Sequence, residues 1–265
     1  MDRRASAMTK LMSVLSFWMT RSIAIVAFVA AWEAVPRLGL MDTTFLPPFS
    51  EVAAKLIELL LSGDMAINIL ASLYRSLTGL FLAIAVSVPL GLLIGWYTRL
   101  GDILSPLLEI FRTTAALALL PVFILILGLG ETSKISMVLY ACLWPILLNT
   151  ISAVRNTDPL LIKSARSMGL TPAKLFIKVV LPASLPTIFT GIRLAGASSI
   201  LVLIACEMAG ARAGLGYLVN FAQFNFQIPT MYAGIIMLSL VGLTFNYTLI
   251  ALERRLTRWR PAPAQ

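Results

Sequence analysis

The chain has 265 residues, of which 59% are hydrophobic and only 12% are charged, and its formal net charge is +9. This composition, with a mean hydropathy of +0.91, excludes an ordinary soluble domain. The sequence has no histidine and two widely separated cysteines, which excludes histidine metal sites, histidine-based catalysis and the usual zinc or haem spacings.

Six apolar segments predict six membrane-spanning helices, because a bilayer core about 30 Å thick needs about 20 apolar residues per helix. We expect these spans at residues 17–35, 76–98, 113–130, 135–154, 183–207 and 231–252. Basic residues precede the first span, as in a secretory signal peptide, but the membrane segments that follow favour an uncleaved span. Both cysteines lie in apolar segments, which favours buried free thiols over a disulfide.

Two connecting segments have a recognisable pattern of their own. Residues 46–64 predict a turn and a short amphipathic helix at the membrane surface, with leucines on one side and Lys55 and Glu58 away from them. Residues 213–229 are rich in glycine and amide side chains. We expect a loop or a re-entrant segment there, before the last span.

Residues 158–182 form a polar, basic island between two long apolar segments. Asp158 followed by Pro159 predicts the start of a helix, and Gly169 predicts its end, because glycine readily adopts the left-handed conformation that terminates helices. The island therefore begins with a short helix and a turn.

A second short helix follows in the same island. Thr171 and Pro172 predict its start, and we expect Pro182 to mark its end. Lys174 and Lys178 share one face of this helix, since residues four apart are neighbours on a helix surface. Such a helix–turn–helix in a membrane protein is suited to contact a partner in the adjacent aqueous phase.

The distribution of lysine and arginine predicts that both termini and residues 158–182 lie in the cytoplasm. That side receives most of the basic residues: Arg3, Arg4, Lys10, Arg99, Arg112, Arg155, Lys163, Arg166, Lys174, Lys178, Arg254, Arg255, Arg258 and Arg260. The outer side receives Arg37, Lys55, Lys134 and Arg212, with Arg75 at a span boundary.

Several ionisable residues lie in or beside the apolar segments, where a charge costs about 2.5–3.5 kcal/mol on insertion scales. Arg193 and Glu207 are candidates for a polar translocation path, with an internal ion pair as the alternative. Their separation of about 21 Å along a helix excludes a direct pair between them. For Glu33 we favour a position at a helix end over a role in a polar path. For Glu109 and Arg112 the alternatives are again a polar path, or an ion pair or helix-end position.

Glycines and prolines mark possible close approaches and kinks. Gly91 and Gly95 form a GxxxG pair, with Gly79 three turns earlier, and predict close packing against another helix of the chain or of a second subunit. The prolines Pro89, Pro121 and Pro145 fall inside predicted spans, as kinks around a pathway or as tolerated prolines of membrane helices.

The island 158–182 resembles the EAA loop of ABC importer permeases, whose pattern is E-A-A, three residues, glycine, nine residues and I-x-L-P. Lys163, Ser164 and Ala165 occupy the E-A-A positions, Gly169 the glycine, and residues 179–182 the last four. Lysine replaces the family's glutamate, a reversal of charge. This departure predicts a compensating acidic residue on the partner.

Further segments are similar to the nitrate, sulfonate and taurine branch of these permeases. They are LPPFSEV at 46–52, SLYRSLTGLFLAI at 72–84, GLGETSK at 128–134, GARAGLGYLV at 210–219 and LERRLTRWR at 252–260. The resemblance implies an all-α polytopic membrane protein of the bacterial inner membrane, with six transmembrane helices and a cytoplasmic coupling helix. The expected divisions are a cytoplasmic segment 1–16, a permease domain 17–252 and a basic tail 253–265.

The resemblance also implies partners and roles. In the family the EAA loop docks into a cytoplasmic ATPase subunit; the residues expected to serve this coupling are Lys163, Ser164, Ala165, Gly169, Leu170, Pro172, Leu181 and Pro182. A second permease subunit, as a homodimer, and a periplasmic binding protein complete the expected assembly. We expect no catalytic residue, cofactor, metal or nucleic-acid partner.

The sequence therefore predicts a transport subunit that imports a small anion, such as an aliphatic sulfonate, taurine or nitrate. The stretch 128–134 lacks the GxxxxGK[ST] spacing of a nucleotide-binding loop, so ATP hydrolysis would belong to another chain. Two alternatives remain open at this point. One is the same kind of permease carrying a vitamin or pyrimidine precursor; the other is an ion-coupled secondary transporter.

Overall fold

The fold was analysed in a computed structural model that describes residues 23–256. Within this range all regular structure is helical. The described helices are one that ends at residue 37, then α2 (Phe49–Leu61), α3 (Asp64–Trp96), α4 (Thr98–Thr113), the 3₁₀ turn η1 (Ala116–Leu119), α5 (Leu120–Leu127), α6 (Glu131–Arg155), α7 (Pro159–Ser167), α8 (Pro172–Leu175), the π-helical turn η2 (Phe176–Val180), α9 (Leu181–Gly210), α10 (Leu215–Phe224) and α11 (Ile228–Leu256). The predicted segment 1–16, the start of the first span and the end of the basic tail lie outside the described residues.

The centre of the molecule is a bundle of α3, α6, α9 and α11, with its core between these helices. α3 packs against α6 through its glycines. A Cβ atom added at Gly91 would lie 2.6 Å from the Cβ of Thr150, and one at Gly79 would lie 2.6 Å from a methyl group of Val138. The glycines therefore serve packing within the chain, which decides between the two readings of the GxxxG pair.

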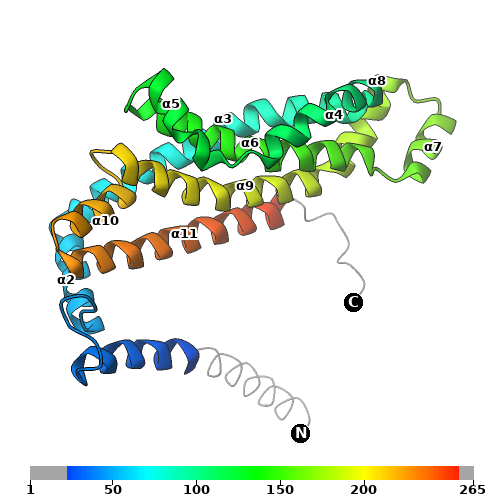
Figure 1. Cartoon of the computed structure of the whole chain (residues 1–265). Coiled ribbons are helices and arrows are strands. Elements are labelled where there is room, and N and C mark those ends of the chain that lie inside the picture. The colour runs from blue at the N-terminus through cyan, green and yellow to red at the C-terminus, as the bar shows by residue number, and fades with distance from the viewer. Residues whose placement is uncertain (1–22, 257–265) are drawn as a thin grey trace, which may run out of the picture.

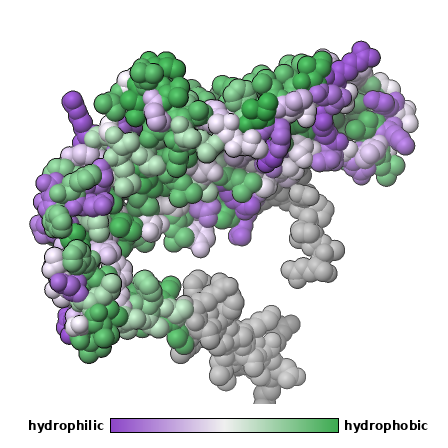
Figure 2. All heavy atoms as spheres, in the orientation of Figure 1, coloured by the Kyte–Doolittle hydropathy of each residue, from purple (hydrophilic) through white to green (hydrophobic). Residues whose placement is uncertain are grey.

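Within residues 23–256, four continuous helices are long and apolar enough to cross a membrane: α3, α6, α11 and the helix that runs without interruption from Pro172 to Gly210. Figure 2 shows hydrophobic residues across the middle of the molecule, with hydrophilic residues gathered most densely at its two ends. These findings describe a multi-pass membrane protein. The first predicted span is described only from residue 23, so its crossing stays a prediction.

The third predicted span, at 113–130, is wrong as a single helix. α4 ends at Thr113, and the following η1–α5 segment is bent from it by 84°. The hydroxyl groups of Thr113 and Thr114 each donate to the carbonyl of Ile110, at 2.9 and 3.0 Å. These bonds satisfy a carbonyl at the helix end, so the chain turns without leaving it unpaired. Pro121 consequently lies at the start of α5 instead of inside a span.

Two further predictions about connecting segments need correction. Residues 215–224 form a short helix, α10, so the expectation of a plain loop is wrong over these residues, while the alternative of a re-entrant segment stays a prediction. The second helix of the island does not end at Pro182 but continues into α9. A proline lacks the N–H that bonds the fourth carbonyl before it and crowds that carbonyl; the wide π-helical turn η2 directly before Pro182 accommodates both effects.

The described part of the N-terminal helix contacts the rest of the molecule through Trp32. Trp32 packs edge-on against Phe49 and Tyr232, at ring centroid distances of 5.7 and 5.5 Å, and its Nε1 donates to the carbonyl of Pro47 at 3.1 Å. The predicted amphipathic helix is present as α2, which buries Val52 and Leu59. In Figure 1, α2 and α10 lie at one end of the molecule, and α7 and α8 lie at the other.

Candidate functional site

The end of the molecule that carries α7 and α8 is the first candidate site. The side chain of Asp158 accepts a hydrogen bond from the backbone N–H of Leu160 at 2.8 Å, and Pro159 occupies the first turn of α7. This is the helix start that the sequence predicts: the carboxylate satisfies a donor left free at the helix end, and the proline needs no donor.

A left-handed glycine ends α7. Gly169 has φ +75°, its N–H donates to the carbonyl of Arg166 at 2.9 Å, and the N–H of Leu170 donates to the carbonyl of Ala165 at 3.3 Å. These two bonds form a Schellman motif, which reverses the chain over a few residues. Gly169 thus fixes the angle between α7 and α8.

The segment α8–η2 connects this turn to the long helix α9. Thr171 stands at the predicted start of α8, but its side chain makes no capping bond; its carbonyl accepts from the N–H of Leu175 at 2.8 Å. Leu175 and Val180 are buried, and Phe176 packs edge-on against Trp96 of α3 at 5.0 Å. The apolar face therefore holds the helix pair on the bundle.

The outward surface of the pair is cationic with apolar residues between the charges. Lys163, Arg166, Lys174 and Lys178 are exposed. Met168 is 79% exposed and Ile177 is 61% exposed. A surface of this kind is typical of a docking site with electrostatic steering around apolar contacts.

The predicted coupling residues divide between this surface and its support. Lys163, Ser164, Gly169 and Pro172 are exposed, Leu170, Leu181 and Pro182 are half-buried, and Ala165 is buried. Ala165, at the third position of the motif, is buried and therefore offers little surface to a partner.

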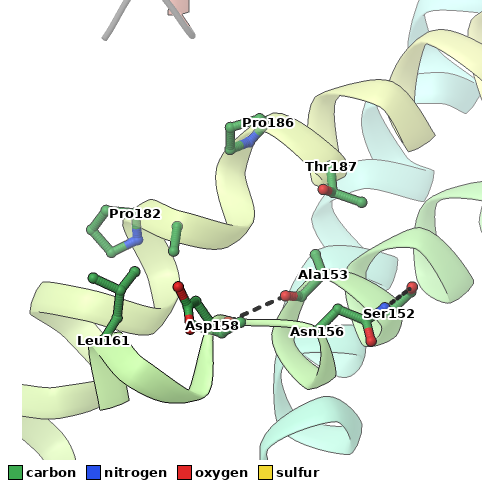
Figure 3. Close-up of a pocket in the computed structure, with 10 residues that line it drawn as sticks. Ser152, Ala153, Asn156, Asp158, Leu161, Pro182, Pro186 and Thr187 are labelled. Atoms are coloured by element: carbon green, nitrogen blue, oxygen red, sulfur yellow. Dashed lines mark hydrogen bonds between the residues drawn. The ribbon is translucent and has the colours of Figure 1, made fainter. Parts of the chain in front are cut away.

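A pocket of about 360 Å³ lies where α7 leaves the bundle. It lies between the end of α6, the start of α7 and the start of α9 (Figure 3). The lining residues are Ser152, Ala153, Asn156, Thr157, Asp158, Leu161, Pro182, Ala183, Pro186 and Thr187. Asn156 donates to the hydroxyl of Ser152 at 3.0 Å. The pocket lies between the start of α7 and the bundle, and η2 connects the helix pair to α9 and packs on α3 through Phe176.

The two residues proposed for a polar path have different surroundings, and the structure does not bring them together. Arg193 lies on α9 with 38% of its side chain exposed, 3.5 Å from the carboxylate of Glu253 on α11. Glu207 is fully buried and accepts from Arg75 Nη1 at 2.6 Å. Each residue therefore has an ion-pair partner that the sequence did not identify.

Arg75 is the centre of a buried polar cluster that sequence reasoning placed only at a span boundary. Besides Glu207, it contacts Glu131 of α6 through Nε at 2.5 Å and Nη2 at 2.7 Å. It also donates to the carbonyl of Ala213 at 2.6 Å. The sequence offered two signals: a lone arginine within α3, and two glutamates near the ends of other helices.

The cluster also holds the start of α10. The N–H groups of Gly214, Leu215 and Gly216 donate to Asn68, Ser72 and Glu207, at 2.8, 2.9 and 2.9 Å. Gly214 has φ +125°, and an added Cβ would lie 2.3 Å from a Glu207 oxygen. Side chains from α3 and α9 thus satisfy the donors that a helix N-terminus leaves free.

The other ionisable residues singled out in the sequence have local partners. Glu33 pairs with Arg37 at 2.6 Å and accepts from the N–H of Ser50 at 2.9 Å, near the end of the N-terminal helix. Glu109 pairs with Arg112 one turn along α4. Glu33 therefore lies near a helix end in an ion pair, and Glu109 and Arg112 form an ion pair with each other.

Known proteins share this sequence and geometry. Residues 87–258 match the family model described as "Binding-protein-dependent transport system inner membrane component". The chain is 33% identical over 243 residues to the putative aliphatic sulfonates transport permease protein SsuC of Bacillus subtilis, covering 92% of this chain and 88% of that one. It is 32% identical over 251 residues to the taurine transport system permease protein TauC of Escherichia coli, covering 92% and 91%.

A solved structure has the same fold. The chain resembles a chain of the inward-facing MetNI methionine ABC transporter with a TM-score of 0.64 and 19% identity, over 75% of this chain and 98% of that one. At this identity the similarity concerns the fold.

Proposed function

The chain belongs to the family of binding-protein-dependent transport system inner membrane components, and we propose that it imports a small anion, with an aliphatic sulfonate, taurine or nitrate as the leading class. Members of this family are permease subunits of ABC transporters, which are transport components and not enzymes. ATP hydrolysis therefore belongs to partner chains. The substrate class rests on the names of the two relatives and on the segments of sequence shared with that branch.

The observation that carries the proposal is the exposed, cationic surface of α7 and α8. Its shape is set by the capped start at Asp158 and the left-handed turn at Gly169. It presents Met168 and Ile177 between four basic side chains. We propose that this surface docks into an ATPase subunit, with Lys163 facing an acidic residue of the partner.

The orientation and assembly follow from the same proposal. If α7 and α8 face the cytoplasm, then α2 and α10, at the opposite end, face the outside (Figure 1). Six spans with both termini inside, the divisions 1–16, 17–252 and 253–265, a homodimer and a bacterial inner-membrane location are parts of this proposal. A periplasmic binding protein would deliver the substrate.

The mechanism we propose is alternating access. ATP-driven closure of the two ATPase subunits would move α7 and α8, and η2 transmits that motion to α9 because the helix is continuous from Pro172 to Gly210. Arg193, partly exposed on α9, is the proposed cation of the anion path. The bonds of Glu207 to Arg75, Ser72 and Gly216 favour a structural role for that residue.

Copurification tests the docking proposal. The chain is coexpressed with its cognate ATPase subunit, and the variant Met168→Asp is compared with the variant Leu61→Asp. The two side chains are similarly exposed, Met168 at 79% and Leu61 at 83%, but they lie at opposite ends of the molecule. We expect Met168→Asp to reduce recovery of the ATPase by about tenfold, the effect of a small hot spot, and Leu61→Asp to leave it unchanged. Equal recovery of the ATPase with both variants would contradict the proposal.

A further inference from the structure

The turn that ends α10 repeats the geometry of the turn that ends α7, with one unusual residue. The N–H of Phe226 donates to the carbonyl of Gln223 at 3.2 Å, and the N–H of Gln227 donates to the carbonyl of Ala222 at 2.8 Å. These bonds form a second Schellman motif, in which Phe226 occupies the left-handed position that Gly169 occupies after α7.

A phenylalanine at this position is conformationally costly. Phe226 has φ +54°, and it is the one residue other than glycine with a positive φ among residues 23–256. Left-handed backbone costs a residue with a Cβ roughly 1–2 kcal/mol, and glycine and asparagine are the residues that adopt it readily. Asn225, which would tolerate a left-handed backbone, directly precedes Phe226 and has φ −93°. The left-handed position is therefore occupied by Phe226 and not by the neighbouring asparagine.

No packing within the described chain compensates for this cost. The side chain of Phe226 is 74% exposed, and that of Phe224, two residues earlier, is 77% exposed. Phe221, one turn before Phe224 on α10, is 45% exposed. These three exposed aromatic residues, called the aromatic patch below, belong to α10 and the turn that follows it, and this segment lies at the end of the molecule opposite to α7 and α8 (Figure 1).

A polar groove adjoins the aromatic patch. It has a volume of about 540 Å³ and lies between α2 and the start of α11, lined by Glu51, Ala54, Lys55, Glu58, Gln227, Pro229 and Thr230. Lys55 and Glu58 form an ion pair at 2.7 Å across its α2 side. Gln227, which lines the groove, follows Phe226 directly in the chain, so the groove begins next to the turn that carries Phe226.

We propose that the aromatic patch and this groove form the docking surface for the soluble solute-binding protein, with Phe226 as its central contact. The inference rests on the proposed function, which places this end of the molecule outside. It assigns the energy of docking to Phe226 and Phe224, because exposed aromatic residues near the centre of an interface contribute most to binding. Strain held in a turn by a side chain that is mostly exposed is typical of a binding element.

The polar groove identifies an aqueous partner. Burial of Glu51, Lys55 and Glu58 in lipid would remove water from three ionisable groups, which bilayers disfavour strongly. A soluble protein can bury the exposed rings and provide hydrogen bonds to the polar lining of the groove. An apolar patch with a charged rim is the composition expected for such a transient interface.

The test compares three variants of Phe226 in the assembled transporter, with the ATPase subunits bound and reconstituted in nanodiscs. Phe226→Gly and Phe226→Asn remove the ring and fit the left-handed backbone, whereas Phe226→Tyr keeps the ring and the strain. The dissociation constant of the cognate binding protein and the thermal stability of the transporter are measured for each. We expect the first two variants to raise the dissociation constant about tenfold or more at equal or higher thermal stability, and Phe226→Tyr to bind as the wild type does.

Other outcomes overturn the proposal in distinguishable ways. Unchanged affinity of Phe226→Gly and Phe226→Asn would exclude Phe226 as the docking contact, while wild-type transport would leave the proposed function intact. A loss of stability in lipid but not in detergent would indicate a membrane anchor, and dissociation of the permease dimer would indicate a contact with a second copy. A wild-type complex that binds no solute-binding protein would refute the proposed function itself.

Discussion

At the scale of single residues, charged side chains are exposed to water at one end of the molecule and buried at the other. Lys163 and Lys174 are exposed at the α7–α8 end, where contact with water keeps each charge inexpensive. Arg75 is 4% exposed at the other end and has two carboxylate partners. A buried charge is tolerated only while its partners remain, so these two groups of residues should respond differently to substitution.

Removal of both partners of the buried pair should cost less than the two single removals added together. We expect Arg75→Met or Glu207→Gln alone to destabilise the protein by about 3–5 kcal/mol, because each leaves a buried charged group without one of its ion-pair partners. The double variant should lose less than the sum of the two. Thermal unfolding in detergent measures this coupling, and additive losses would show that the pair makes no specific contribution.

Gly169 supports a second prediction at this scale. A Cβ atom there would meet nothing within 4 Å, so a substitution acts only through the left-handed backbone, φ +75°. We expect Gly169→Val to raise the free energy of the left-handed turn by about 1–2 kcal/mol and to reduce coupled uptake about tenfold, with normal amounts of folded protein. Gly169→Asn, which tolerates this conformation, is the control. Normal uptake by the valine variant would remove Gly169 from the coupling role.

Local sequence signals predicted this turn well. Asp158 and Gly169 act through bonds to residues within five positions of them, so the residue types alone indicate the geometry. Arg75 could not be placed in the same way, because Glu131 and Glu207 are 56 and 132 residues away in the chain. Phe226 gave no signal either, since its type disfavours the conformation that it adopts.

At the scale of helices, the contact between α3 and α6 depends on residues without side chains. Gly79, Gly91 and Gly95 each face α6 at a distance that leaves no room for a methyl group. The two backbones therefore approach closely, and van der Waals attraction between them stabilises the pair in lipid, where the hydrophobic effect does not drive helix association. The periodicity of these glycines was visible in the sequence, whereas the identity of the facing helix was not.

Substitution in this contact should therefore be costly. An alanine at Gly91 would place its Cβ 2.6 Å from Thr150 Cβ, and we expect Gly91→Ala to lower stability by about 1–3 kcal/mol. Gly242→Ala on α11 is the matched control, since nothing lies within 4 Å of its added methyl group. Its effect should be neutral or slightly stabilising, because alanine is the better helix former. Equal thermal stability of both variants would contradict the packing account.

Tertiary context also explains the errors in helix boundaries. Hydropathy located α3, α6, α9 and α11, since each is a long apolar helix. It failed at Thr113 and Thr114, where hydroxyl bonds to Ile110 turn the chain inside an apolar stretch. It failed at Pro182 as well, because η2 lets the helix continue through a residue that normally ends one.

At the scale of the whole molecule, the two polar ends are linked by continuous helices. α9 begins beside the candidate coupling surface and ends at the cluster of Arg75 and Glu207, which holds the start of α10. Motion applied at α8 therefore has a direct route to the end where the aromatic patch lies.

The central claim is that the α7–α8 surface binds an ATPase subunit, and site-directed cross-linking tests it most directly. The native thiols of Cys142 and Cys206 are 0% and 2% exposed, whereas Met168 is 79% exposed, so Met168→Cys supplies a single reactive thiol. With a thiol- and amine-reactive reagent, we predict that this variant cross-links to the coexpressed ATPase subunit and that Leu61→Cys, at the opposite end, does not. A Met168→Cys protein that reacts with soluble thiol reagents but never cross-links to the ATPase would contradict the account.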